Sequence, residues 1–117
     1  MNISIKKLFS SSAPAFKSIN SSEAAAIMAS GRDHIVVDVR RPSEFASGHI
    51  PGAVNIPNES IGSSAPASLP EKDRLILVHC LSGARSRAAA SKLAAMGYSN
   101  VLDFGGISSW QGALIRD

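Results

Sequence analysis

A run of four aliphatic residues leads into the single cysteine of the chain and then into a glycine-containing segment that opens a helix. Residues 75–78 have the uniform apolar character of a strand that is covered on both faces. Residues 86–96 are rich in strong helix formers, and Gly97 after them is typical of a helix end. This pattern predicts a strand, a short loop and a helix, the repeating unit of a parallel α/β sheet.

The position of Cys80 in this unit predicts a reactive thiolate. Cys80 comes just before a helix N-terminus, where unpaired N–H groups and the helix dipole favour an anion. Arg85 and Arg87 lie in the first turn of that helix, and no acidic residue occurs between Arg74 and Asp103 to neutralise them. We therefore expect a thiol of lowered pKa and an anionic substrate held by Arg85. The alternative is an inert, buried thiol beside solvated arginines.

The loop from Cys80 to Arg85 has six residues, short enough for successive N–H groups to turn inward as an anion-binding nest. Gly83 is expected to adopt a positive φ in so tight a loop. Ser82 and Ser86 can donate hydroxyl hydrogen bonds to the sulfur or cap the helix. His79 precedes the cysteine on the strand, so its side chain is expected on the opposite face.

The composition fits one domain without disulfides or a resident metal. The chain has 117 residues, of which 44% are hydrophobic and 18% charged, which excludes a disordered chain. A single cysteine excludes an intramolecular disulfide, and the three histidines show no ligand spacing, so no metal or other cofactor is expected. The net charge of +3 comes from dispersed residues, and this pattern does not imply a nucleic-acid partner.

The N-terminal residues 1–14 are expected to form a flexible leader before a domain at residues 15–117. The leader lacks the long apolar core of a signal peptide, and no stretch of the sequence has the length of a membrane span. We therefore expect a cytoplasmic protein with no membrane contact.

Strand and helix patterns alternate along the chain. Asn20 with Glu23 three residues later predicts the capped start of the first helix. The alternation predicts a mostly parallel sheet covered by helices, with ligands at the carboxyl ends of the strands. Cys80 follows the carboxyl end of one predicted strand, and residues 38–40 lie at the carboxyl end of another. Strands are expected at 15–19, 35–39, 53–56, 75–78 and 101–104, and helices after residue 20, around 43–46 and over 86–96.

Four ordered sequence blocks resemble the single-domain rhodaneses, sulfurtransferases that carry sulfur as a cysteine persulfide. Residues 80–86, C-L-S-G-A-R-S, resemble the active-site loop C-x-x-G-x-R-S of that family. Residues 38–45, D-V-R-R-P-S-E-F, and residues 48–57, G-H-I-P-G-A-V-N-I-P, are similar to two further family segments. Residues 105–110, G-G-I-S-S-W, resemble its closing block. The blocks span nearly the whole chain from residue 15 onward.

The resemblance implies a fold and a set of site residues. The expected fold is a single α/β rhodanese-like domain with a five-stranded, mostly parallel sheet in the order 1-5-4-2-3, flanked by helices on both faces. Cys80 would be the catalytic nucleophile, and Asp38, Arg40 and Glu44 would form a polar network under or beside its loop, although a surface ion pair is an alternative. The substrate-binding residues would be Leu81, Ser82, Gly83, Ala84, Arg85 and Ser86.

Three functions remain open from the sequence. The first is sulfur transfer from a small anionic donor such as thiosulfate to cyanide or a thiol through a Cys80 persulfide. The second is a persulfide carrier in a relay with a protein partner. The third is a phosphatase or arsenate reductase of the related fold, which typically needs a loop one residue longer and a general acid. Leu81 and Ala84 stand where many relatives carry polar or basic side chains, so donor recognition would depend on Arg85 and the loop amides.

Overall fold

Five parallel strands form one sheet in the computed structural model, which describes residues 16–62 and 64–116. The order across the sheet is β1-β5-β4-β2-β3, and every pairing of neighbouring strands is parallel. The expected order 1-5-4-2-3 is confirmed, and the sheet is wholly rather than mostly parallel. The strands are β1 (Lys17–Ser18), β2 (Ile35–Asp38), β3 (Val54–Asn55), β4 (Ile76–Cys80) and β5 (Val101–Gly106).

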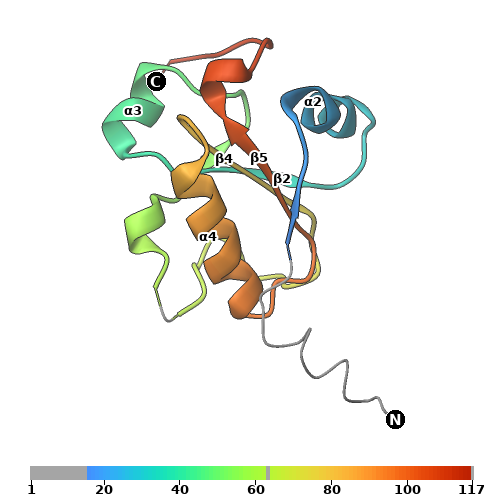
Figure 1. Cartoon of the computed structure of the whole chain (residues 1–117), viewed down its shortest axis with the longest axis vertical. Coiled ribbons are helices and arrows are strands. Elements are labelled where there is room, and N and C mark those ends of the chain that lie inside the picture. Colours follow the sequence, from blue (N-terminus) through green and yellow to red (C-terminus); the bar gives the residue numbers. More distant parts are fainter. Residues whose placement is uncertain (1–15, 63, 117) are drawn as a thin grey trace.

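Helices cover both faces of the sheet, as expected (Figure 1). Helix α4 (Ala84–Ala95) packs on one face, where its Leu93 shares a core with Val78. Helix α2 (Ser21–Ala29) packs on the other, where its Ala24 shares a second core with Leu77. The remaining helical segments are α3 (Pro42–Ser47), η1 (Asn58–Ser60) and η2 (Ile107–Ser109), the last two being single turns of 3-10 helix.

Strand β4 lies between these two cores, and this position explains its sequence. Ile76, Val78 and Cys80 face the core under α4, whereas Leu77 faces the core under α2. All five residues of β4 are buried. A strand buried on both faces needs apolar residues at successive positions, which is the run that the sequence shows.

The element bounds differ from the expected ones in a few places. Strand β1 is only Lys17–Ser18, while residue 15 and the expected leader at 1–14 lie outside the described residues. Helix α4 begins at Ala84, two residues earlier than expected, because Gly83 in a left-handed conformation already turns the chain into the helix. Helix α2 begins with the predicted cap, in which Asn20 Oδ1 accepts the Glu23 N–H at 2.8 Å. Within the described parts of the chain, no helix is long and apolar enough to cross a bilayer.

Candidate active site

The Cys80 sulfur lies at the carboxyl end of β4 and is bound by the loop that follows. Cys80 is 1% exposed. Gly83 has φ +115°, the positive value expected for it, and its N–H donates to Cys80 Sγ at 3.0 Å. The loop thus bends back so that backbone donors face the sulfur.

The environment of Cys80 favours the thiolate. Burial opposes ionisation, but hydrogen bonds from the Ser86 hydroxyl and from the N–H groups of Ser86, Gly83 and Ser82 outweigh it. The pKa of Cys80 is therefore lowered from its ordinary value, which is the direction that the sequence predicted.

Ser86 is buried under the loop and bonds to an acidic residue of β5. Its hydroxyl donates to Asp103 Oδ1 at 2.7 Å, and Gly83 O lies 3.0 Å from the same hydroxyl. Asp103 is only 4% exposed and also accepts the Gly105 N–H at 2.9 Å. Asp103 is not among the site residues predicted from the sequence, although a single charged residue in the otherwise apolar run 101–104 was a usable signal.

An irregularity near the end of β5 brings that end of the strand into contact with the loop. Val78 pairs with Asp103 and Cys80 with Gly106, so β5 has one extra residue at this point. The backbone at Gly106 is so close to the loop that a Cβ there would lie 2.2 Å from the Leu81 oxygen. Ser108 Oγ also donates to that oxygen, at 3.2 Å. The glycine pair and η2 therefore pack directly against the loop. This role was not predicted from the sequence.

Arg85 is bound by Glu44 of α3. Two hydrogen bonds of 2.7 and 3.0 Å join the guanidinium to the two carboxylate oxygens. The hydrogen bond from Arg85 and a second from the Arg41 N–H lower the pKa of Glu44 from 4.5 to about 2. The expectation that nothing neutralises Arg85 is wrong, because its partner is distant in the sequence. The Arg85 side chain is still 28% exposed.

Asp38 and Arg40 form a separate, buried pair. Arg40 Nη2 donates to Asp38 Oδ2 at 2.7 Å and to the Gly48 oxygen at 2.8 Å. Asp38 is fully buried and Arg40 is 5% exposed, so this is not the surface ion pair offered as an alternative. The three polar residues expected in one network belong to two pairs, of which only Glu44–Arg85 reaches the loop. Asn55, which was not predicted as a site residue, holds this turn in place, because its Nδ2 donates to the backbone oxygens of Asp38 and Arg40.

The two buried histidines pack against phenylalanine rings. The ring of His79 packs beside Phe104 with centroids 5.1 Å apart, on the face opposite to Cys80. Burial lowers the pKa of His79, and its Nε2 lies 3.6 Å from Asp38 Oδ2. His49 stacks on Phe45. These positions agree with structural roles for both rings.

The six expected substrate-binding residues fall into three groups by exposure. Leu81, Ser82 and Ala84 are exposed, Arg85 is half-buried, and Gly83 and Ser86 are buried. The first three therefore form the outer rim of the loop, while the buried pair contacts the sulfur from inside.

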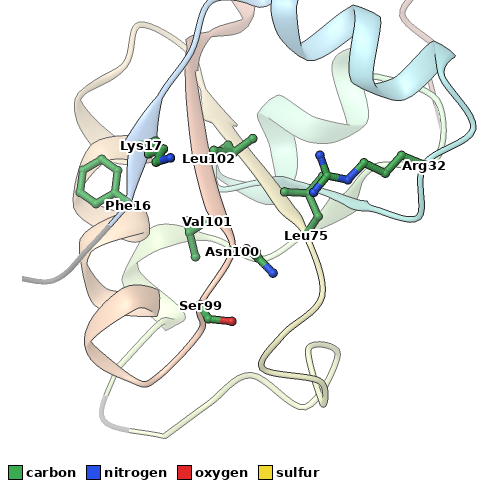
Figure 2. Close-up of a pocket in the computed structure, with 8 residues that line it drawn as sticks. All are labelled: Phe16, Lys17, Arg32, Leu75, Ser99, Asn100, Val101 and Leu102. Atoms are coloured by element: carbon green, nitrogen blue, oxygen red, sulfur yellow. The ribbon is translucent and has the colours of Figure 1, made fainter.

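A separate hollow of about 430 Å³ lies where β1, β4 and β5 begin (Figure 2). The loop of Cys80 follows the opposite, carboxyl end of β4, so this hollow is not part of the site described above. Its lining residues are Phe16, Lys17, Arg32, Leu75, Ser99, Asn100, Val101 and Leu102.

The fold and the loop define an α/β domain with a buried thiol of lowered pKa at the carboxyl end of its central strand, facing backbone donors of the loop that follows. The chain belongs to the family of the rhodanese-like domain, whose family model matches residues 20–113. A sulfurtransferase of Allochromatium vinosum is 39% identical over 79% of this chain and 85% of its own length. The thiosulfate sulfurtransferase GlpE of Pseudomonas entomophila is 37% identical over 82% of this chain and 85% of its own length.

Solved structures agree with this family. A rhodanese-related protein of Thermoplasma volcanium superposes with a TM-score of 0.73 at 30% identity, covering 86% of this chain and 99% of its own. A rhodanese with anions from Escherichia coli superposes with a TM-score of 0.66 at 28% identity, covering 72% of this chain and 99% of its own. The predicted family and fold class are therefore confirmed.

Proposed function

We propose that this protein is a sulfurtransferase that moves a sulfane sulfur from a small anionic donor such as thiosulfate to cyanide or a thiol through a Cys80 persulfide. The observation that carries the proposal is the loop donor set at Cys80, with the Gly83 N–H 3.0 Å from the sulfur and a lowered thiol pKa. The thiosulfate sulfurtransferase names of relatives at 37% and 34% identity support the same donor.

The geometry suits a two-step transfer. The Cys80 thiolate attacks the outer sulfur of thiosulfate, a new S–S bond forms, and sulfite leaves with the electron pair of the old one. The terminal sulfur of the persulfide then carries the negative charge, and the loop N–H groups stabilise that charge as they stabilised the thiolate. In the second step the acceptor attacks the terminal sulfur and restores the thiolate, so no metal or organic cofactor enters either step.

Arg85 has a smaller part in donor binding than a free arginine would have. Its guanidinium donates to both carboxylate oxygens of Glu44, and these hydrogen bonds to Glu44 raise the pKa of Arg85. The pair joins α3 to the first turn of α4 and so restrains the end of the loop. The exposed part of the Arg85 side chain can still attract an anionic donor toward the rim.

A cytoplasmic location is part of this proposal. The chain has one cysteine, and its chemistry needs the free thiol that a reducing compartment maintains.

The direct test is to load the protein with thiosulfate and measure its mass. We expect the protein to gain one sulfur atom and to release it as thiocyanate when cyanide is added. Cys80→Ser should keep the fold and lose both results, because a hydroxyl is a weak nucleophile at neutral pH. Appreciable turnover by this variant would contradict the persulfide mechanism.

A protein acceptor is the second candidate. Leu81, next to the nucleophile, is 44% exposed and gives the rim an apolar contact point. The adenylyltransferase and sulfurtransferase UBA4 of Meyerozyma guilliermondii is 40% identical over 67% of this chain, which spans only 20% of that protein. Leu81→Ser should slow transfer to a protein thiol while leaving transfer to cyanide unchanged. Equal effects on both acceptors would contradict a docking role for Leu81.

A further inference from the structure

The ion pair between Arg85 and Glu44 takes up the positive charge that the cysteine loop would otherwise offer to a donor. Arg85 is the only cation among residues 80–86. Its Nη1 donates to Glu44 Oε1 at 2.7 Å and its Nη2 to Glu44 Oε2 at 3.0 Å. The planar fork of donors that suits an oxyanion is therefore already occupied by a carboxylate of this chain.

Glu44 is fixed by its own helix as well as by Arg85. It is the third residue of α3, and its Oε1 accepts the Arg41 backbone N–H at 2.8 Å, as in a helix cap. The pKa of Glu44 is lowered to about 2, so its carboxylate is ionised at every physiological pH. A donor that bound Arg85 directly would have to displace a carboxylate that keeps both its charge and its position.

Arg85 lies within electrostatic reach of the sulfur. The hydrogen bonds to Glu44 are the main cause that raises the pKa of Arg85, and the charge of Cys80 is a further cause. Opposite charges that lie close together act on a third charge much less than either does alone, because their contributions largely cancel. The rim of the loop is therefore nearly neutral, and its exposed residues Leu81 and Ala84 are apolar.

We infer that Glu44 is a specificity-determining residue that, by holding Arg85 in a neutral pair, shifts the preference of the loop from doubly charged sulfur donors toward singly charged donors with an apolar group. Alkanethiosulfonates are donors of this class. The inference deepens the sulfurtransferase function proposed above and rests on it.

Two donors test this preference with the same reaction. Thiosulfate is a dianion, whereas methanethiosulfonate has a methyl group in place of one oxygen and carries a single negative charge. With either donor the Cys80 thiolate attacks the outer sulfur and a new S–S bond forms. The old S–S bond breaks, and its electron pair leaves on sulfite or on methanesulfinate. No proton, oxidant or reductant is needed, so the two donors can be compared directly in each variant.

Glu44→Gln removes the negative charge and keeps the length of the side chain. Arg85 then has an uncompensated positive charge beside the loop. A unit charge about 7 Å away changes the local concentration of a monoanion in water by about threefold. We therefore expect single-turnover uptake from thiosulfate, relative to methanethiosulfonate, to rise about threefold. Asp33→Asn breaks the exposed ion pair with Arg74, before the start of β2 and β4, and is the matched control that should leave this ratio unchanged.

Alkylation of Cys80 gives the same comparison without sulfur transfer. Iodoacetate is an anion and iodoacetamide is a neutral molecule of similar size. Taking the ratio of the two rates at one pH removes any change in the fraction of thiolate. Glu44→Gln should raise the ratio of iodoacetate to iodoacetamide about threefold, and added salt should reduce this gain. A loosened loop would instead change both rates together.

A double-mutant cycle tests whether the effect passes through the pair. Arg85→Gln leaves the charge of Glu44 alone, so the ratio of iodoacetate to iodoacetamide should fall about threefold below that of the wild type. The double variant Glu44→Gln/Arg85→Gln is neutral again and should return close to the wild-type ratio. The nearby charged residues Arg40, Glu59 and Arg87 are unchanged in every variant.

An unchanged or lower ratio in Glu44→Gln would overturn the inference. A double variant as slow with iodoacetate as Arg85→Gln would also overturn it, because Arg85 would then bind the anion in the wild type. Should Glu44→Gln not fold, the wild-type protein decides: its alkylation ratio should vary less than about twofold with salt, and a steeper fall would refute a neutral rim. If neither donor adds sulfur to the wild-type protein, the proposed function fails, and the alkylation ratios still decide the role of Glu44.

Discussion

Replacing Gly106 by alanine tests how closely the active-site loop must be supported. The added Cβ would lie 2.2 Å from the Leu81 oxygen and 2.8 Å from both the Leu81 carbonyl carbon and the Ser82 Cα. These are backbone atoms, so no side chain can rotate to relieve the contact. The loop has to move by about 1 Å, and overpacking of this kind costs about 1–3 kcal/mol of the free energy of unfolding.

The effect on catalysis should be larger than the effect on stability. A misplacement of about 1 Å in a reacting group can reduce a rate about 100-fold. We therefore expect Gly106→Ala to fold, to unfold at lower urea concentration, and to lose most of its sulfur uptake from thiosulfate. The fitting assay is single-turnover persulfide formation followed by mass spectrometry, beside urea denaturation of the same samples.

Two other glycines provide controls for this variant. Gly62→Ala meets no atom within 4 Å and involves no positive φ, so both stability and sulfur uptake should be unchanged. Gly105→Ala meets open space but has φ +85°, so it isolates the cost of the left-handed backbone, about 1–2 kcal/mol. Wild-type sulfur uptake by Gly106→Ala would show that the contact between β5 and the loop has no part in holding Cys80.

Three further predictions concern charge and substrate class. Alkylation of the wild-type Cys80 should stay fast at pH values well below the ordinary thiol pKa of about 8.5, because the pKa of Cys80 is lowered; a midpoint near the ordinary value would contradict the donor set of the loop. Glu44→Gln should cost about 1 kcal/mol in urea denaturation at neutral pH, as expected for a partly exposed ion pair. The pKa of Glu44 is depressed in the folded state, so this difference is complete above pH 4.5 and should vanish as the pH falls toward about 2; a pH-independent difference would disprove the pairing. The protein should not hydrolyse aryl phosphates, because the loop of six residues is short for a tetrahedral phosphate; efficient hydrolysis with no sulfur uptake would refute the proposed function.

The fold was readable from the sequence because its signals are local. The apolar run at residues 75–78 showed a strand buried on both faces, and Asn20 with Glu23 showed where α2 begins. Gly83 marked the turn between β4 and α4. The strand order came from the family resemblance, since alternating strands and helices alone leave several orders open.

The site was readable only in part, because half of its contacts join distant segments. Cys80 and Gly83 are close in sequence, and their geometry follows from a strand that runs into a helix N-terminus. Glu44 lies 41 residues before Arg85, so counting charges near the loop missed it. Asp103 reaches Ser86 only because β5 pairs with β4, and the extra residue in β5 that brings Gly106 under the loop has no local signature beyond the glycine pair.

Because the loop depends on contacts with β5, the reactivity of the Cys80 thiol also depends on how far the chain has folded. Asp103 and Gly106 pair with β4, and Ser108 donates to Leu81 of the loop, so the contacts that hold the loop come from residues that follow Cys80 in the sequence. Until these contacts form, Cys80 is an ordinary thiol on an incomplete sheet. The reactivity of Cys80 therefore appears only with the completed fold. The rate at which a refolding chain gains fast alkylation then measures how quickly β5 pairs with β4 at the centre of the sheet.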